Sequence, residues 1–167
     1  TNRGGELQKD DPEKGRRLLK EGGWKGGAGG LLQKNGAVFE VTFVSAQQDH
    51  RHLNVFIQDL KKVGIKASIE QLSYSTLQKR IDNHDFDLYW SSWGASRLRD
   101  PEASWHSSEA MEVATNNYPG LQNKVVDSLI EAQKTIFDLD KRNEILKQID
   151  NRLHKQIPYI LMWQSDH

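Results

Sequence analysis

Hydrophobic residues change their spacing along this chain, and the spacing predicts where helices and strands lie. Leu53, Phe56, Ile57 and Leu60 recur at intervals of three and four residues, which is typical of the buried stripe of a helix. Gly64 follows at a position where a left-handed cap would end that helix. We therefore predict a helix that contains Leu53 and ends before Gly64.

Three other segments have the alternation or the aromatic content of strands. They are residues 39–43, 65–69 and 86–90. Asn35-Gly36 lies between Leu31-Leu32 and the first of them and is a strong signal for a two-residue hairpin turn that joins two strands there. The predicted helix separates two of these strands, so the order indicates a βαβ unit with a right-handed crossover and a sheet that is at least partly parallel. We predict an α/β fold with a mixed β-sheet flanked by helices.

The N-terminal part begins with a helix signal and continues into a glycine-rich segment. Asp11 can cap a helix, and Pro12 fits its first position, so a short helix is predicted over residues 12–21. Six of the nine residues from 22 to 30 are glycine. No regular element tolerates glycine well, and no Gly-Lys-Ser/Thr sequence closes the run as in a phosphate-binding loop. We predict a flexible connection and no nucleotide site.

The C-terminal half contains a long stretch without periodicity, from residue 91 to residue 120. A loop of this length in a compact domain is usually functional. A short helix around Leu77 and Ile81 is predicted before it, and two helices are predicted after it. Their inward residues are Val126, Leu129, Ile130 and Gln133 in the first and Ile145, Ile149 and Leu153 in the second. Residues 158–163 predict a last strand.

Composition narrows the possible classes of function. The 167 residues carry 23 Lys and Arg against 23 Asp and Glu, so the basic surface of a nucleic-acid-binding protein is not expected. There is no cysteine, which excludes disulfides, thiolate zinc sites and a cysteine nucleophile. No apolar run approaches the ~20 residues that a membrane span needs.

Three segments with histidine could carry chemistry, and each has a simpler interpretation. His50 and His52 are two residues apart, so on a helix they would not share a face for one metal ion, and a polar helix start is predicted. His84 stands among three aspartates in what we predict to be an ordinary solvated turn. His106 adjoins residues 107–109 (SSE), but no Gly-x-Ser-x-Gly turn presents a serine nucleophile. We therefore predict no active site, metal or cofactor.

The better candidate for a ligand site is the irregular segment itself. Trp93 and Trp105 lie there among small polar residues, and such aromatic side chains suit the wall of a binding cleft. Arg97 and Arg99 could bind a carboxylate or a phosphate through two hydrogen bonds each.

Several motifs occur in an order that is found in one known family. They are residues 11–14 (DPEK), 17–24 (RLLKEGGW), 58–66 (QDLKKVGIK), 86–88 (FDL), 93–95 (WGA), 100–101 (DP), 116–118 (NNY), 126–130 (VDSLI) and 157–160 (IPYI). In this order the chain resembles the C-terminal lobe of the oligopeptide- and dipeptide-binding proteins of bacterial ABC importers, the family 5 extracellular solute-binding proteins. Each motif alone is weak, and the whole series is specific.

The resemblance implies a function in transport and not in catalysis. It implies that residues 1–167 form one lobe of a longer two-lobe protein, which captures peptides or modified peptides by hinge closure. The implied partners are the ligand, a membrane permease and the N-terminal lobe of the same chain, and we expect a monomer. The implied location is the periplasm, or the cell surface with a lipid anchor on the full-length protein.

The same resemblance points to a ligand site. In peptide-binding members an Asp anchors the ligand's amino terminus directly after a Trp-Gly-Ala sequence, and here Ser96 holds that place. A hydroxyl cannot give the charge-assisted bond that an ammonium receives from a carboxylate, so a blocked amine or another modified peptide is expected. The predicted ligand-binding residues are Trp93, Gly94, Ala95, Ser96, Arg97, Arg99, Trp105, Asn117 and Tyr118.

Two other classes of function remain open from the residues. One is a small α/β hydrolase-like enzyme that uses His106 with a nearby serine or carboxylate. The other is a protein-interaction module that uses the Trp- and Arg-containing segment 91–120, because these residue types are common at interface hot spots.

Overall fold

The computed structural model describes residues 11–92 and 100–160. The chain divides into two compact units. Among the described residues, the sheet unit comprises residues 11–81 and 85–92, and the helical unit comprises residues 82–84 and 100–160. That residues 1–167 act as one lobe stays a prediction.

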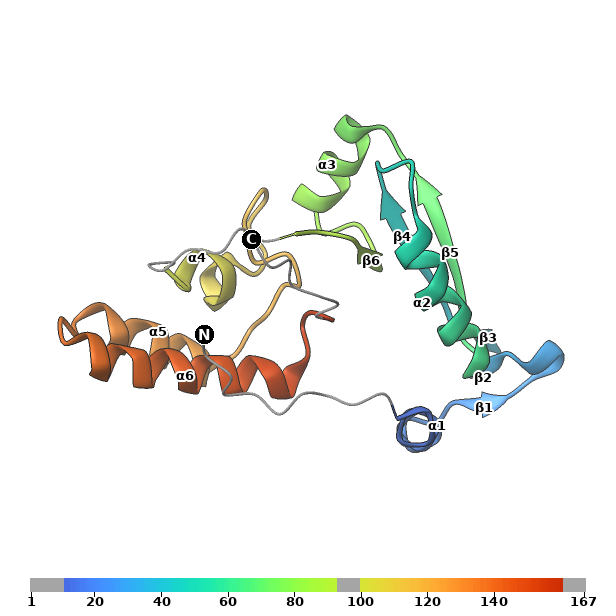
Figure 1. Ribbon diagram of the computed structural model, residues 1–167, viewed down its shortest axis with the longest axis horizontal. Helices are drawn as coiled ribbons and strands as arrows, with labels where there is room; N and C mark the ends of the chain where they lie inside the picture. The colour runs from blue at the N-terminus through green and yellow to red at the C-terminus, as the bar shows by residue number, and fades with distance from the viewer. Residues whose placement is uncertain (1–10, 93–99, 161–167) are drawn as a thin grey trace. The chain divides into compact units, whose positions relative to one another are not determined.

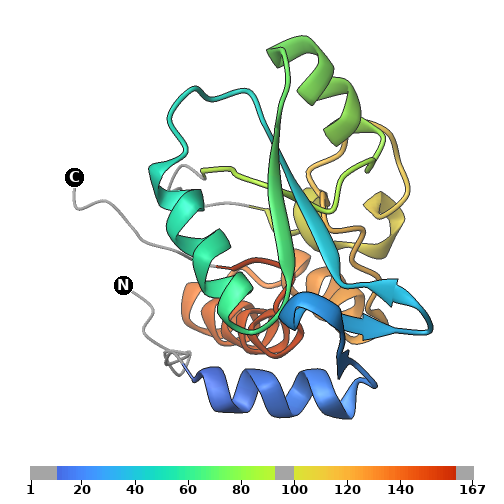
Figure 2. The ribbon, with the colours of Figure 1, turned by 90° about the vertical axis from the view of Figure 1, so that its right-hand side faces the viewer.

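The sheet unit is built on a parallel three-stranded sheet. Its strand order is β5-β4-β6, with β4 at Glu40–Ser45, β5 at Lys66–Gln71 and β6 at Leu88–Tyr89. Helix α2 (Arg51–Lys62) connects β4 to β5 and lies along them, as Figures 1 and 2 show. The parallel pairing and the end of α2 before Gly64, whose φ is 86°, confirm the predicted βαβ unit. Helix α3 (Tyr74–Asp82) follows β5.

The core of the parallel sheet comes from consecutive residues of β4, from α2 and α3, and from the residue before β5. Phe43, Val44, Leu53, Ile65 and Ile81 are all buried. The ring of Phe43 meets that of Phe56 edge to face at 5.9 Å. Burial of such apolar side chains is the main force that holds α2 against the sheet.

A second, antiparallel sheet contains β1 (Lys25–Gly26), β2 (Leu32–Lys34) and β3 (Ala37–Val38). Asn35 and Gly36 connect β2 to β3 with φ values of 54° and 81°, as the predicted two-residue turn requires. The hairpin partner of β2 is therefore β3 and not the strand predicted at residues 39–43, because β4 pairs with β5 and β6 in the other sheet. The prediction that residues 22–30 are only a connection was wrong, since they include β1 and a 3-10 turn at Ala28–Gly30.

Helix α1 (Pro12–Glu21) begins as its sequence predicts. Pro12 is its first residue, and the Asp11 carboxylate accepts a hydrogen bond of 2.8 Å from the Lys14 amide. Lys34 from the hairpin donates to the carbonyl of Gly22, which follows the helix. The hairpin thus binds the C-terminal end of α1.

The helical unit is organised around α5 (Lys124–Lys134) and α6 (Leu139–Gln156), which lie side by side (Figure 1). Asn123 and Asp138 cap the two helices through their side chains. Val126, Ile130 and Ile149 form the buried core; Trp105, Leu129, Ile145, Leu146 and Leu153 pack around it. These positions confirm the predicted inward faces.

The rest of the helical unit differs from the predictions in two places. The irregular segment contains α4 (Glu102–Trp105) and a 3-10 turn η2 (Ser107–Glu109). Residues 158–160 form a bend where a strand was predicted, and residues 161–163 of that prediction lie outside the described residues. Ile157 takes a left-handed conformation with φ 50° after α6, which turns the chain there. No helix in the described ranges is long and apolar enough to cross a membrane.

Candidate functional site

The predicted ligand-binding residues fall in two groups. Trp93, Gly94, Ala95, Ser96, Arg97 and Arg99 lie outside the described residues, while Trp105, Asn117 and Tyr118 lie in the helical unit. These three belong to the segment 100–123, which we call the 100–123 loop. Its geometry shows which side chains hold it in place.

Asn117 is the central support of this loop. Its residue is 0% exposed. The Nδ2 group donates to the carbonyls of His106 at 3.1 Å and Leu121 at 3.0 Å, and Oδ1 accepts from the Leu121 amide at 2.9 Å. Both amide hydrogens are therefore used within the loop, and the side chain ties together two turns of the backbone. A ligand-binding role for Asn117 stays a prediction.

His84 fixes the same loop from the turn after α3. Its Nδ1 lies 3.1 Å from the carbonyl oxygen of Tyr118, and its Nε2 lies 3.3 Å from that of Glu112. The Ala114 amide also donates to the carbonyl of Asp82 at 3.1 Å. His84 has φ 54°, which directs the chain out of the helix. Asp85 and Asp87 are exposed, as predicted for a solvated turn, but the contacts of His84 were not predicted, because nothing local in the sequence marks these distant partners.

The aspartates beside His84 are also engaged, in the sheet unit. The Thr42 amide of β4 donates to Asp87 Oδ2 at 2.9 Å. Arg80 Nε lies 3.2 Å from Asp85 Oδ2, and its Nη1 pairs with Glu70 at 2.7 Å. The hydrogen bond with Glu70 is the main cause that raises the pKa of Arg80. These carboxylates serve structure and are not paired with one another for acid–base chemistry.

Trp105 and Tyr118 have different surroundings. The Trp105 ring packs against the core of α5 and α6 and meets the Tyr159 ring edge to face at 5.3 Å. The Tyr118 hydroxyl donates to Asn116 Oδ1 at 3.3 Å near the surface. Trp105 therefore contributes to the core, whereas Tyr118 makes its side-chain hydrogen bond within the loop, and both residues are half-buried.

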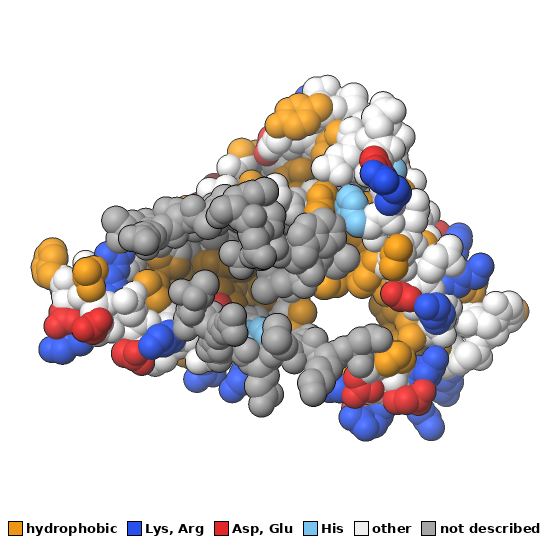
Figure 3. Space-filling view, in the orientation of Figure 1, with side chains coloured by type: hydrophobic (Ala, Val, Ile, Leu, Met, Phe, Trp, Pro, Cys, Tyr) orange, Lys and Arg blue, Asp and Glu red, His pale blue; other side chains and the backbone are white. Residues whose placement is uncertain are grey.

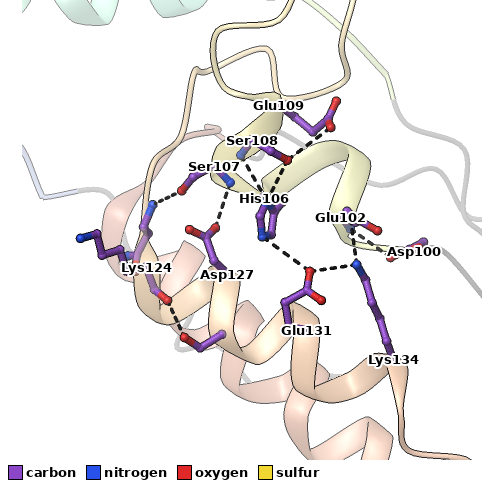
Figure 4. A network of polar contacts seen from close by, with 12 residues as sticks. Asp100, Glu102, His106, Ser107, Ser108, Glu109, Lys124, Asp127, Glu131 and Lys134 are labelled. Carbon is purple, nitrogen blue, oxygen red and sulfur yellow. Dashed lines mark hydrogen bonds and ion pairs between the residues drawn. The ribbon is translucent and has the colours of Figure 1, made fainter.

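A polar network connects α4 and the loop to α5 (Figure 4). Lys134 Nζ lies 2.8 Å from both Glu102 Oε1 and Glu131 Oε1. The hydrogen bond with Glu102, followed by that with Glu131, raises the pKa of Lys134. Near the start of α5, the Asp127 carboxylate accepts from the Ser107 amide at 2.9 Å.

His106 lies within this network, and its contacts bear on the hydrolase alternative. Nδ1 lies 2.8 Å from the Ser108 hydroxyl but also accepts from the Ser108 amide at 3.2 Å, so the ring caps the η2 turn. Nε2 is 3.6 Å from Glu131, beyond hydrogen-bond distance. A serine hydrolase also needs free amides beside the nucleophile to bind an oxyanion.

The amides of this turn are already used. Those of Ser107 and Ser108 donate to Asp127 and His106, and that of Glu109 donates to the His106 carbonyl. The arrangement therefore offers no oxyanion site next to Ser108 and does not favour hydrolysis.

Metal chemistry finds no support in the described ranges either, where no three His, Cys, Asp or Glu residues come together to hold an ion. At the start of α2 the Arg51 amide donates to Asp49 Oδ1 at 3.0 Å, whereas both ring nitrogens of His50 are buried and have no hydrogen-bond partner among the described residues. Side chains of both charges occur on the part of the face in Figure 3 that is not grey.

Comparison with known proteins identifies the family. The model of the middle region of the bacterial extracellular solute-binding proteins, family 5, matches residues 2–115. This chain belongs to that family. The membership confirms the resemblance drawn from the sequence motifs, and the family is one of binding proteins and not of enzymes.

Individual relatives of this family 5 chain are peptide-binding proteins by name. The chain is 27% identical over 142 residues to the "Probable peptide-binding protein YejA" of Agrobacterium fabrum. This match covers 83% of the chain and 23% of that protein. The chain is also 28% identical over 163 residues to the "Dipeptide-binding protein" of Escherichia coli. That match covers 93% of the chain and 28% of the relative.

A solved structure gives the same relation in three dimensions. The oligopeptide-binding protein AppA from Bacillus subtilis, in complex with a nonapeptide, matches 94% of this family 5 chain with a TM-score of 0.80 and 27% identity. The chain covers 33% of that protein. It therefore has the fold of part of a periplasmic binding protein and spans at most about a third of the relatives described.

Proposed function

We propose that this chain is part of the ligand-binding region of a protein that captures oligopeptides or modified peptides for an ABC importer. The observation that carries the proposal is the match of nearly the whole chain to an oligopeptide-binding protein in complex with a nonapeptide. Family 5 membership and the peptide-binding relatives support the same class of ligand.

The proposed mechanism is closure of two lobes on the ligand. Contacts with both lobes favour the closed state, so each lobe alone has only part of the binding free energy. The rest of the protein would supply the second lobe, and a membrane permease would receive the ligand. A periplasmic or cell-surface location follows from this role.

The proposed ligand contacts are centred on the segment that follows Trp93. Ser96 holds the place where peptide-binding members carry an Asp, and Arg97 and Arg99 add positive charge beside it. This combination favours a ligand with a carboxylate or a blocked amine over an ordinary free amine. The loop supports at Asn117 and His84 would keep the neighbouring Tyr118 backbone in place during binding.

The test is a titration of the labelled chain, followed by nuclear magnetic resonance, with Ala-Ala-Ala and with its N-acetylated form. We expect both peptides to shift backbone amide signals with millimolar affinity, a free energy of ~4 kcal/mol, and the acetylated form to bind more tightly. Ser96→Asp should reverse that preference, because it restores the carboxylate. Ser108→Asp adds the same charge at an exposed position of the η2 turn and is the matched control.

Three outcomes would contradict the proposal in different ways. Binding of a sugar or a metal chelate without any peptide binding would overturn the ligand class. Equal preference for both peptides in the wild type and Ser96→Asp would overturn the role of Ser96. A submicromolar affinity of this chain alone would contradict the need for a second lobe.

A further inference from the structure

The sheet unit contains a cavity to which α1, the hairpin and the end of α2 contribute residues. It has a volume of about 380 Å³ and lies where α1, the β1-β2 pair and the end of α2 meet. Leu19, Trp24, Leu32 and Val63 give it an apolar lining. This volume is within the range of cavities that bind small organic molecules.

Two neighbouring side chains hold the Trp24 ring, the aromatic part of the cavity lining, in place. The Trp24 ring stacks on Phe39 with the ring centres 4.2 Å apart. Lys34 Nζ lies 6.0 Å from the centre of the Trp24 ring while it donates to the Gly22 carbonyl. A ring fixed by two neighbours loses little conformational freedom when a ligand binds.

The rim of the cavity is cationic. Arg16, Lys20 and Lys25 line it, and no acidic residue from the described ranges 11–92 and 100–160 does. Arg16 is paired with Glu13, whereas Lys20 and Lys25 form no ion pair in the part of the chain that the structure describes. The whole chain has no net charge, so two unpaired cations beside an apolar cavity are a local feature. They complement an anion whose remainder is apolar.

We propose that this cavity binds a small amphipathic anion, with an apolar body against Leu19 and Trp24 and a carboxylate or sulfonate between Lys20 and Lys25. A neutral apolar molecule would leave the two ammonium groups unused, and a fully polar anion would leave the apolar lining unused. The site does not depend on peptide capture, and its failure would leave that function untouched.

The probe is anilinonaphthalene sulfonate, and its neutral counterpart is N-phenylnaphthylamine; both report binding by fluorescence. We expect saturable binding of the sulfonate and weaker binding of the neutral compound. The pair Lys20→Gln and Lys25→Gln should weaken sulfonate binding by about three- to tenfold and leave the neutral compound unchanged. The pair Lys14→Gln and Lys61→Gln removes the same charge from outside the cavity and should change sulfonate binding less than about twofold.

A second pair of variants tests the apolar lining. Leu19→Ala should weaken both probes by about fivefold or more, because it removes buried contact area. Leu18→Ala alters the neighbouring residue, which is 55% exposed and outside the cavity, and should leave the binding of both probes unchanged. The proposal is overturned if neither probe binds, if both respond alike to the lysine variants, or if Leu18→Ala matches Leu19→Ala. Circular dichroism on each variant confirms that its fold is retained.

Discussion

The parallel sheet and the 100–123 loop satisfy their backbone polar groups in opposite ways. In the sheet, β4 pairs residue for residue with β5 from Glu40 to Ser45, so neighbouring backbones mostly serve each other, with the Thr42 amide that donates to Asp87 as an exception. In the loop, side chains serve the backbone: Asn117, His84 and Asp127 supply the partners. A ladder tolerates side-chain changes that leave its pairing intact, whereas such a loop depends on particular residues.

The largest effect is expected in the core on which the loop rests. Ile130 is 0% exposed between α5 and α6, and Ile130→Ala should lower the free energy of unfolding by about 2–5 kcal/mol. Val125, in the same helix, is 47% exposed, and Val125→Ala should change it by less than about 0.5 kcal/mol. Urea unfolding monitored by circular dichroism measures both. Equal losses would mean that this core does not set the stability of the helical unit.

Next in size is the loss of the central loop support. Asn117→Ala removes three hydrogen bonds from a buried site and should lower the free energy of unfolding by about 1–3 kcal/mol. Hydrogen exchange should rise at the Leu121 amide and leave the β4 amides unchanged. Asn116→Ala, at an exposed neighbour, is the control. Faster exchange in β4 as well would break the contrast between the two regions.

A smaller effect is expected where the sheet unit itself depends on one residue. Gly64 has φ 86°, and an added Cβ would lie 2.9 Å from the carbonyl oxygen of Gly30. Gly64→Ala should therefore lower the free energy of unfolding by about 1–2 kcal/mol. Gly15→Ala, within α1 and with open space around it, should raise it by about 0.5–1 kcal/mol. Thermal melts measure both changes. If the two variants shifted the melting temperature in the same direction, the special backbone role of Gly64 would be contradicted.

The smallest effect concerns the exposed network of Lys134. Folding raises the pKa of this ammonium. Its contribution to the free energy of unfolding is therefore complete below the ordinary pKa of 10.5 and is lost as pH rises through the pKa of the folded state. Lys134→Met should lower the melting temperature slightly from pH 7 to 10 and converge with the wild type at higher pH. The Lys124 side chain forms no ion pair with any described residue, so Lys124→Met should show no such convergence.

Much of the fold could be predicted from local residue chemistry. Asp11 and Pro12 start a helix, Asn35-Gly36 forms a two-residue turn, and apolar spacing marks the inner faces of α2, α5 and α6. Each of these signals acts between residues only a few positions apart, which is why it is legible in the chain. The family could be recognised for the same reason, since its motifs are local and ordered.

The candidate site was less predictable. Trp105, Asn117 and Tyr118 were placed correctly in one loop, but the buried amide of Asn117 and the two contacts of His84 were not foreseen. His84 and Tyr118 are far apart in the sequence, and a histidine after a helix carries no signal for a particular carbonyl partner.

The sequence alone determined where α1 begins, that α2 ends before Gly64, where the hairpin turns and which family the chain resembles. Only the tertiary structure decided that β3 and β4 enter different sheets, that residues 158–160 bend, and that His84 and Asn117 hold the loop. The reason is that caps and turns are formed by neighbouring residues, whereas strand partners and buried hydrogen bonds exist only once distant segments have met.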